Sequence, residues 1–205
     1  TAAAPDGSGQ ARGRPRDPRT DAAIMAAARR LLTEVGYDQV SMESIAREAG
    51  VSRPTVYRRW PSKAHVVFEA AFGTAGSTAL AASTGDFETD LREFARGAVQ
   101  FWREPVVSAA AMGILADRRR DPALQIRTQQ LLDDKIRAEL AALIRGAATH
   151  GVVRPDVDTD LLFDTLVGTA FYGALVDGRN ADQLADKLCS LMLQGVRPRQ
   201  DREPR

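Results

Sequence analysis

Residues 40 to 63 read VSMESIAREAGVSRPTVYRRWPSK, and this stretch predicts a helix-turn-helix. From Met42 to Ala49 the apolar residues recur at i, i+3, i+4 and i+7, which is the spacing of one buried helical face. Ser41 precedes this face, where its hydroxyl can cap the first free N–H groups of the helix. The pattern therefore predicts a short first helix with one side in a protein core.

A tight turn and a second helix follow. Gly50 stands where the chain needs a left-handed backbone angle, which glycine adopts at little cost. Ser52 is the expected cap of the second helix, and Pro54 falls in its first turn, where the missing N–H is not needed. Val56 and Trp60 are four residues apart and point back to the core, so the opposite side of this helix is left exposed.

The exposed side of the second helix carries three arginines and two hydroxyl side chains. Such a cluster has two explanations, a solvated surface or a surface that binds DNA. One helix with its side chains fits the major groove of B-DNA. An arginine there can bond O6 and N7 of guanine together, while threonine and tyrosine hydroxyls suit phosphate oxygens. The favoured interpretation is DNA recognition by Arg53, Thr55, Tyr57, Arg58 and Arg59.

At these residues the chain resembles the tetracycline-repressor (TetR) family of transcriptional regulators. The resemblance rests on RRLLTEVGY at 29–37, SMESIAREAGVS at 41–52 and TVYRRWPSK at 55–63, in about the first third of the sequence. It implies an all-α, homodimeric protein that binds DNA, usually as a repressor, with a small-molecule pocket and the dimer interface in a C-terminal domain. The family often has His and Phe near the end of the recognition helix, where this chain has Arg59 and Trp60.

Basic charge concentrates around this motif. Residues 1–63 hold eleven Lys and Arg against seven Asp and Glu, a difference of +4. Residues 64–205 hold seventeen against twenty, or −3, and the whole chain carries +1. This distribution is the electrostatic footprint expected of a DNA-binding domain.

Residues 1–18 are rich in Ala, Gly, Pro, Ser and Arg without any apolar period, so we expect a disordered basic arm. Within it, GRPR at 13–16 resembles the short Gly-Arg-Pro arm that enters narrow A·T minor grooves, where the negative potential is strongest. A solvated basic tail is the alternative. The residues expected to contact DNA, from pattern, arm and family resemblance together, are Arg14, Arg16, Ser41, Met42, Ser52, Arg53, Pro54, Thr55, Tyr57, Arg58, Arg59 and Lys63.

The rest of the chain reads as further helices. Before the motif, one buried stripe closed by Gly36 consists of Ile24, Ala27, Ala28, Leu31, Leu32 and Val35. After it, helices are expected from residue 62 past 73, at 84–104, 105–120, 121–150 and 158–176, and through 184–192. The predicted fold is all-α: a three-helix helix-turn-helix domain at 19–64, a helical ligand-binding and dimerisation domain at 65–196, and a disordered tail at 197–205.

The helix at 158–176 is apolar on almost every side, and such a helix needs partners all round. We therefore expect it to face a second chain, together with the helix through 184–192. A central helix of a monomer is the alternative. The residues predicted at the dimer interface are Leu166, Ala170, Phe171, Gly173, Ala174, Leu184, Leu188 and Leu191.

The family resemblance implies an effector pocket among three helices of the C-terminal part, and these helices carry aromatic residues with a few polar groups among them. The predicted lining is Phe94, Phe101, Trp102, Met112, Thr165, Thr169 and Tyr172. Core packing is the alternative explanation for the aromatic side chains. Because this lining has no excess of carboxylates, the expected effector is a small hydrophobic molecule, neutral or anionic.

Other function classes find little support in the sequence. There is no His-Glu-x-x-His, Gly-x-Ser-x-Gly or paired-cysteine pattern. His65 and His150 are expected at the surface, so neither an enzyme, a cofactor nor a metal is predicted. The lone Cys189, expected to be buried, and the lack of a signal or membrane-span pattern favour a cytoplasmic protein. Two alternatives remain: a ligand-binding or enzymatic helical protein with a vestigial helix-turn-helix, and a DNA binder without an effector.

Overall fold

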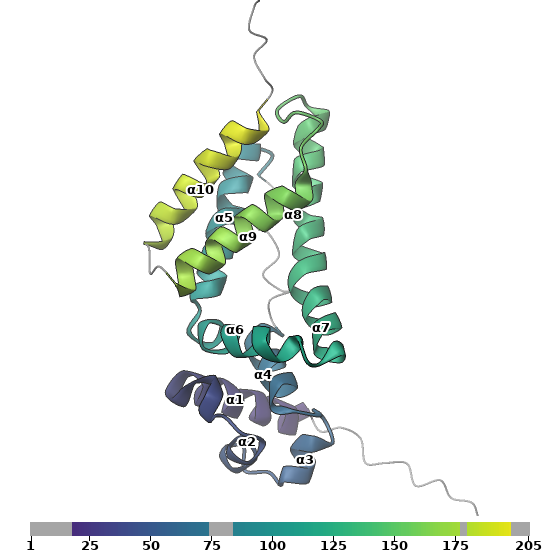
Figure 1. Cartoon of the computed structure of the whole chain (residues 1–205), viewed down its shortest axis with the longest axis vertical. Helices are drawn as coiled ribbons and strands as arrows, with labels where there is room; N and C mark the ends of the chain where they lie inside the picture. The colour runs from purple at the N-terminus through teal and green to yellow at the C-terminus, as the bar shows by residue number, and fades with distance from the viewer. Residues whose placement is uncertain (1–17, 74–83, 177–179, 198–205) are drawn as a thin grey trace, which may run out of the picture.

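The computed structural model describes residues 18–73, 84–176 and 180–197, and within these ranges every regular element is helical. The chain forms α1 (Pro18–Gln39), α2 (Met42–Glu48), α3 (Arg53–Tyr57), α4 (Lys63–Phe72), α5 (Phe87–Arg103), α6 (Pro105–Arg118), α7 (Pro122–Thr128), a π-helical segment (Gln129–Asp134), α8 (Lys135–Thr149), α9 (Thr159–Leu175) and α10 (Ala181–Val196). Figure 1 shows α1 to α4 at one end of the molecule, α6 beside them, and α5, α8, α9 and α10 at the other end. The predicted all-α fold is confirmed.

The helix-turn-helix forms as its residue pattern predicts. Ser41 caps α2: its Oγ accepts the Ser44 N–H at 3.0 Å, and the Ser44 hydroxyl oxygen accepts the Ser41 N–H at 2.9 Å. Gly50 has a φ of 65°, the left-handed angle that the turn requires. The predicted cap by Ser52 is wrong in one respect, because its hydroxyl pairs with the Thr55 hydroxyl at 2.8 Å and makes no cap bond to a backbone N–H.

The end of α1 differs from the prediction. The predicted stripe includes Val35, but this side chain is 49% exposed. Gly36 has a φ of 76°, and the residue after it, Tyr37, is buried instead. Its ring lies against α6 where Gly113 leaves room for it, since a Cβ built at Gly113 would lie 2.2 Å from Tyr37 Cδ1. Tyr37, not Val35, therefore closes the core at this point.

Polar contacts complete the junction between α1 and α6. The Tyr37 hydroxyl donates to Asp117, and both its burial and this hydrogen bond raise the pKa of Tyr37. Lys63 Nζ lies 4.3 Å from the centroid of the Tyr37 ring and donates to the Tyr37 carbonyl at 3.0 Å. Arg29 donates to the Ala70 carbonyl at 2.6 Å and to Glu104 at 2.9 Å. The α1 helix is thus bonded to α4 and to the start of α6.

The hydrophobic core continues across the predicted boundary between residues 64 and 65. One cluster of buried side chains combines α1 to α4 with Val106, Val107, Ala110 and Ile114 of α6 and Leu124 of α7. Burying apolar surface in common favours the two parts moving together. His65, predicted at the surface, belongs to this buried region: its Nδ1 lies 2.9 Å from Ser62 Oγ and 3.6 Å from Asp121 Oδ2.

A second core fills the opposite end of the molecule. It is built from α5, α8, α9 and α10, with Leu91, Phe94, Leu140, Ile144, Phe163, Leu166, Leu184 and Leu188 among its buried residues. Cys189 is fully buried in it, as predicted, and burial raises the pKa of its thiol. The helix predicted at 121–150 forms as α7 and α8 with the π-helical segment between them.

A chain of aromatic rings joins the two cores. Ring centroids are 5.4 Å apart for Phe68 and Phe72, 6.4 Å for Phe72 and Trp102, and 5.0 Å for Trp102 and Phe171. Trp102 packs against both clusters of buried residues. Because tilted and edge-to-face ring pairs favour one geometry, this chain links the position of α4 to that of α5 and α9.

We expect Gly113→Ala to destabilise the protein, because the added methyl group would overlap the Tyr37 ring; overpacking of this kind costs about 1–3 kcal/mol. Gly97 is the matched control, a helical glycine of α5 whose added Cβ would meet nothing within 4 Å. Gly97→Ala should stabilise the fold by about 0.5–1 kcal/mol. Urea unfolding followed by circular dichroism measures the free energy of unfolding of both variants. Equal changes in this free energy would contradict the packing of Tyr37 against Gly113.

Candidate DNA-binding helix and C-terminal cavity

The exposed side of α3 is polar and basic. Arg53, Tyr57 and Arg58 are exposed there, as are Ser52 and Pro54 at its start. Arg53 Nη2 lies 2.6 Å from Glu43 Oε1 of α2, and its guanidinium carbon lies 5.7 Å from the centroid of the Tyr57 ring. To grip a guanine, the Arg53 guanidinium must therefore exchange the Glu43 carboxylate for the base. Sequence reasoning missed Glu43, since no spacing rule links the two positions.

Two of the predicted DNA contacts need correction. The Met42 side chain is buried, because Met42 belongs to the inward face of α2 that its own apolar spacing predicts. Arg59 is turned away from the exposed side of α3: its side chain is 10% exposed and forms an ion pair with Asp21 of α1. Its Nη1 also donates to the Thr55 carbonyl at 3.3 Å. Arg59 therefore holds α3 against α1.

Three further predicted contacts that the structure describes are Ser41, Thr55 and Lys63. Thr55 is half-buried beside the Ser52 hydroxyl, and Ser41 is occupied in capping α2. Lys63 is held by the ring and carbonyl of Tyr37, so a phosphate contact would have to compete with them. Arg14 and Arg16 lie outside the described residues. The basic groups presented outward by α3 are those of Arg53 and Arg58.

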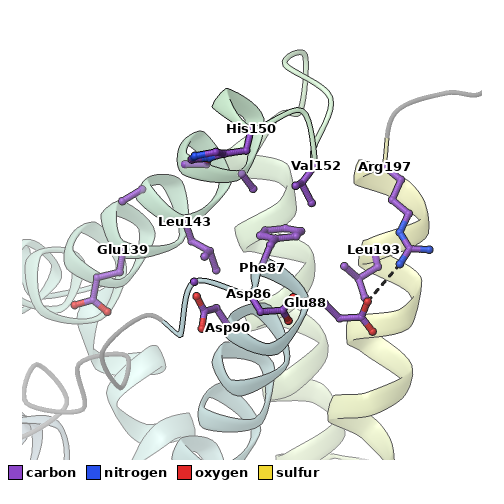
Figure 2. Close-up of a pocket in the computed structure, with 14 residues that line it drawn as sticks. Asp86, Phe87, Glu88, Asp90, Glu139, Leu143, His150, Val152, Leu193 and Arg197 are labelled. Carbon is purple, nitrogen blue, oxygen red and sulfur yellow. Dashed lines mark hydrogen bonds and ion pairs between the residues drawn. The ribbon is translucent and has the colours of Figure 1, made fainter.

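A cavity of about 670 Å³ lies between the start of α5, the α8 helix from Glu139 onward and the end of α10. Figure 2 shows Phe87, Leu143 and Leu193 directed toward its interior. These helix ends are at the far end of the molecule from α3 (Figure 1). The lining consists of Gly85, Asp86, Phe87, Glu88, Asp90, Glu139, Ala142, Leu143, Gly146, Ala147, His150, Val152, Leu193 and Arg197.

The predicted pocket residues do not line this cavity. Phe94 is buried in the second core, and Phe101 and Trp102 pack against buried side chains with Phe72 as a neighbour. Of the remaining residues, Met112 is 63% exposed and Tyr172 is 55% exposed. Thr165 is also exposed, and Thr169 is half-buried. Core packing, the alternative interpretation, describes the aromatic side chains of α5 better.

Most of the predicted dimer contacts also need correction, because they pack inside one chain. Leu166, Ala170, Gly173, Leu184 and Leu188 are buried in the second core. A Cβ at Gly173 would lie 2.3 Å from Leu184 Cδ2, so α9 and α10 approach each other closely there. Phe171 contacts Trp102, Ala174 is half-buried, and Leu191 alone of the eight is largely exposed, at 63%.

The outward side of α9 is a different set of residues. Spaced by three or four positions, Leu161, Thr165, Gly168, Tyr172 and Val176 are all exposed. Thr165 and Tyr172, predicted for the pocket, thus lie on the outward side of α9, whereas Leu166, Ala170 and Gly173, predicted for the dimer interface, are buried. Of the predicted histidine positions, His150 is exposed as expected, although it borders the cavity.

No helix within residues 18–73, 84–176 and 180–197 is long and apolar enough to cross a membrane. Over the same ranges, no group of three or more His, Cys, Asp and Glu residues is arranged to hold a metal ion. A basic recognition helix exposed on a helix-turn-helix, carried by a larger helical domain, defines the class of DNA-binding transcriptional regulators.

Comparison with known proteins identifies the family. Residues 24–70 match the family described as bacterial regulatory proteins, tetR family, and residues 81–191 match the tetracyclin repressor-like C-terminal domain. The chain belongs to the TetR family of transcriptional regulators.

Relatives that align with this chain over most of their length are also transcriptional regulators. The HTH-type transcriptional regulator YdeS of Bacillus subtilis is 31% identical over 82% of this chain and 84% of its own length. The DNA-binding transcriptional repressor TetR of Mycobacteroides abscessus is 32% identical over 76% of this chain and 89% of its length. The crystal structure of the TetR family transcription regulator SCO0332 has a TM-score of 0.66 at 29% identity, covering 88% of this chain and all of that one.

The two adjacent arginines that follow α3 should behave differently when truncated. Arg59→Ala removes a nearly buried, charge-assisted hydrogen bond to Asp21, and we expect it to lower the free energy of unfolding by about 1–3 kcal/mol. Arg58→Ala changes an exposed side chain and should leave stability within about 0.5 kcal/mol of the original. Thermal unfolding followed by circular dichroism measures both, and equal melting temperatures would contradict the inward position of Arg59.

Proposed function

We propose that this protein is a ligand-responsive repressor that binds a palindromic DNA operator as a homodimer. The observation that carries the proposal is the separation of two sites within one packed molecule. The basic face of α3 lies at one end, and the cavity between α5, α8 and α10 lies at the other. A DNA-binding regulator acts where the chromosome is, which places it in the cytoplasm. One relative of 32% identity is described as a DNA-binding transcriptional repressor.

Sequence recognition rests on Arg53 and Arg58. Arg53 stands at the start of α3, the end of a recognition helix that reaches base edges in this motif, and Arg58 lies just beyond its last turn. Both side chains are exposed. Tyr57 and Ser52 offer hydroxyl groups for phosphate oxygens, and Lys63 at the start of α4 offers an ammonium group if it leaves the Tyr37 carbonyl.

Dimerisation supplies the second recognition helix. A two-fold protein reads a palindrome by presenting two helices about one DNA turn, roughly 34 Å, apart. The outward side of α9 offers an apolar surface for this contact in Leu161, Tyr172 and Val176. Gly168 lies between them with open space around its Cα, so a helix of a second copy can approach closely. Leu191 of α10 is also exposed, by 63%.

The route from the cavity to α3 follows the packing. The α5 helix begins at the cavity with Phe87 and ends near Trp102, whose ring contacts Phe72 of α4. The next helix, α6, packs against both α1 and α4. An effector that shifts α5 can thereby change the position of the helix-turn-helix. The effector must bind the arrangement that cannot bind DNA more tightly than the arrangement that can. Shifting the ratio of the DNA-binding to the non-binding arrangement from 99:1 to 1:99 takes about 5.5 kcal/mol of differential binding.

Selection of binding sites from random DNA, followed by gel shift, tests the DNA-binding part. We expect a palindromic consensus, because a two-fold dimer presents α3 twice. Arg53→Ala should weaken binding to the selected site by roughly ten- to hundredfold and relax preference at particular base pairs. Arg53→Lys keeps the charge but loses the paired hydrogen bonds, so it should relax preference with a smaller loss on random DNA. Equal losses on selected and random DNA for Arg53→Ala would contradict base reading.

The dimer surface is tested with Tyr172→Asp. This change places a charge on the outward side of α9, and we expect sedimentation to show monomers with unchanged helix content. Gln125→Asp, on the exposed side of α7, is the control and should remain dimeric. Leu188→Asp should instead unfold the chain, because Leu188 belongs to the second core. A Tyr172→Asp protein that stays dimeric would show that another surface makes the contact.

A further inference from the structure

We infer that Glu43 recognises DNA together with Arg53, so that the two side chains read one G·C base pair. Arg53 donates to the guanine, and the Glu43 carboxylate accepts from the amino group of the paired cytosine. This recognition rests on the proposed function, because it takes Arg53 as a residue that contacts base edges. It deepens that function by adding a specificity-determining residue of α2 and by naming the base pair that α2 and α3 recognise together.

The tips of the two side chains lie together at the surface. Arg53 Nη2 and Glu43 Oε1 are 2.6 Å apart, and the side chains are 54% and 50% exposed. Arg53 is the first residue of α3, and Glu43 stands in the first turn of α2. The two helices pack together at the same end of the molecule (Figure 1). A base edge that reaches Arg53 is therefore within reach of Glu43 as well.

The local structure directs Glu43 toward the recognition helix. Ser41 caps α2 two residues before Glu43, so the start of that helix is held in place. Glu43 pairs across to Arg53, although the exposed Arg47 lies four residues further along α2, at a spacing that favours an ion pair within one helix. Within α3, the centroid of the Tyr57 ring lies 5.7 Å from the guanidinium carbon of Arg53. Arg53 is thus contacted from both helices.

The major-groove edge of a G·C pair offers groups that match these two side chains. Guanine presents the acceptors O6 and N7, and cytosine presents the N4 amino group, which is the donor of that edge. A guanidinium has only donors, and an ionised carboxylate has only acceptors. O6 and N4 are hydrogen-bonded to each other, about 2.9 Å apart. A neighbouring donor and acceptor of the protein therefore meet a neighbouring acceptor and donor of the DNA.

An A·T pair in the same orientation does not match. Adenine presents its N6 amino group where guanine presents O6, and thymine presents O4 where cytosine presents N4. The Arg53 guanidinium then faces a donor, and the Glu43 carboxylate faces an acceptor. Polar groups left unpaired in an interface cost free energy. The two side chains therefore discriminate against this replacement at both bases of the pair.

DNA binding also creates the need for a new donor to Glu43. Arg53 engages a guanine by leaving the Glu43 carboxylate, whose oxygen then loses its donor in a surface surrounded by phosphates. An unpaired charge in such an interface is unfavourable. The donors on base edges in the major groove are the amino groups of cytosine and adenine, and opposite a guanine the base is cytosine. The cytosine amino group therefore replaces the guanidinium as the partner of Glu43.

A carboxylate that only competes for Arg53 gives the opposite expectation. Binding to a guanine would then include the cost of separating the Arg53–Glu43 pair, whereas on other sequences the pair stays intact. Removal of Glu43 would increase the preference for G·C. If Glu43 accepts from cytosine, its removal decreases that preference, because a hydrogen bond to a charged group contributes more than an exposed ion pair. The sign of the change distinguishes the two roles.

The test uses the operator obtained by site selection and the base pair at which Arg53→Ala relaxes preference. We expect this pair to be G·C. Fluorescence anisotropy measures the affinity for the operator and for a copy with A·T at this pair in one half-site. Glu43→Ala should reduce the preference for G·C about tenfold. Because the Arg53–Glu43 pair is exposed, this variant should keep its fold. An equal or larger preference in Glu43→Ala would overturn the inference.

Glu48→Ala is the matched control. Glu48 lies on the same helix, and its Oε1 is 3.1 Å from Nη2 of Arg30 in α1. Its replacement changes the charge of α2 by the same amount but leaves the partner of Arg53 in place. Affinity for the two DNA molecules should rise alike, because repulsion of the phosphates decreases, and the preference for G·C should not change. A loss of preference as large as that in Glu43→Ala would assign the effect to charge alone and overturn the inference.

A modified base isolates the amino group. In N4-methylcytosine a methyl group replaces the hydrogen directed into the groove, whereas the guanine edge and its pairing are kept. The original protein should bind an operator with this base in one half-site about tenfold more weakly, and Glu43→Ala should bind both operators alike. Deazaguanine, in which a C–H group replaces N7, should weaken binding of both proteins, because Arg53 loses an acceptor. Equal losses for both proteins on N4-methylcytosine would contradict the contact with Glu43.

Failure of this recognition differs from failure of the proposed function. If Arg53→Ala relaxed no base pair, base reading by Arg53 would fail, and recognition by the two side chains would fail with it. If Arg53→Ala relaxed a G·C pair while Glu43→Ala kept the full preference, the proposed function would stand and Glu43 would have no part in recognition.

Discussion

The Tyr37 ring packs into the space left by Gly113 of α6, and the rest of the structure depends on this contact. It closes the core in which α1 to α4 bury their apolar sides, and its hydroxyl and carbonyl bond Asp117 and Lys63. Without α6, a helix-turn-helix of this size would have little apolar surface to bury. The DNA-binding helices are therefore stabilised by the domain that carries the cavity. Their position must respond to the position of α6.

The aromatic chain from Phe68 through Phe72 and Trp102 to Phe171 extends this dependence to the second core. Packed side chains do not deform smoothly, because interiors are as dense as organic crystals. A displacement of α5 at the cavity end would then change the packing at Trp102. This arrangement gives a physical basis for two distant sites to share one equilibrium, as an effector-responsive regulator requires.

Charged side chains around α3 and the cavity are already bonded to other groups of the protein, and a bound partner must replace these contacts. Arg53 is bonded to Glu43, Lys63 to the Tyr37 carbonyl, and Glu88 to Arg197. For the exposed pairs the exchange is inexpensive, since surface ion pairs contribute little in water. DNA phosphates and bases can thus replace the partners of Arg53 without large cost. The buried oxygen of Glu139 is the exception, because within the described residues it has no partner to lose.

The sequence by itself determined the helix-turn-helix, the all-α fold and the family. Residues 40–63 combine apolar spacing, a cap at Ser41 and a left-handed Gly50, and each of these local signals acts within a few residues. Arg53 and Arg58 could be predicted as exposed from the same spacing. Arg59 could not, because its partner Asp21 lies in another helix and no local rule brings the two together.

Only the tertiary structure decided which side of α9 faces the core. That helix is apolar almost all round, so its periodicity does not distinguish an inward side with Phe163, Leu166 and Ala170 from an outward side with Leu161 and Tyr172. The cavity depends likewise on the ends of three helices far apart in the sequence. Its acidic character arises because Asp90 and Glu139 come together through packing, whereas along the chain they are separated by three helices and their turns. Short-range patterns determine individual helices, but the choice of buried side and the shape of a cavity depend on the other helices that cover them.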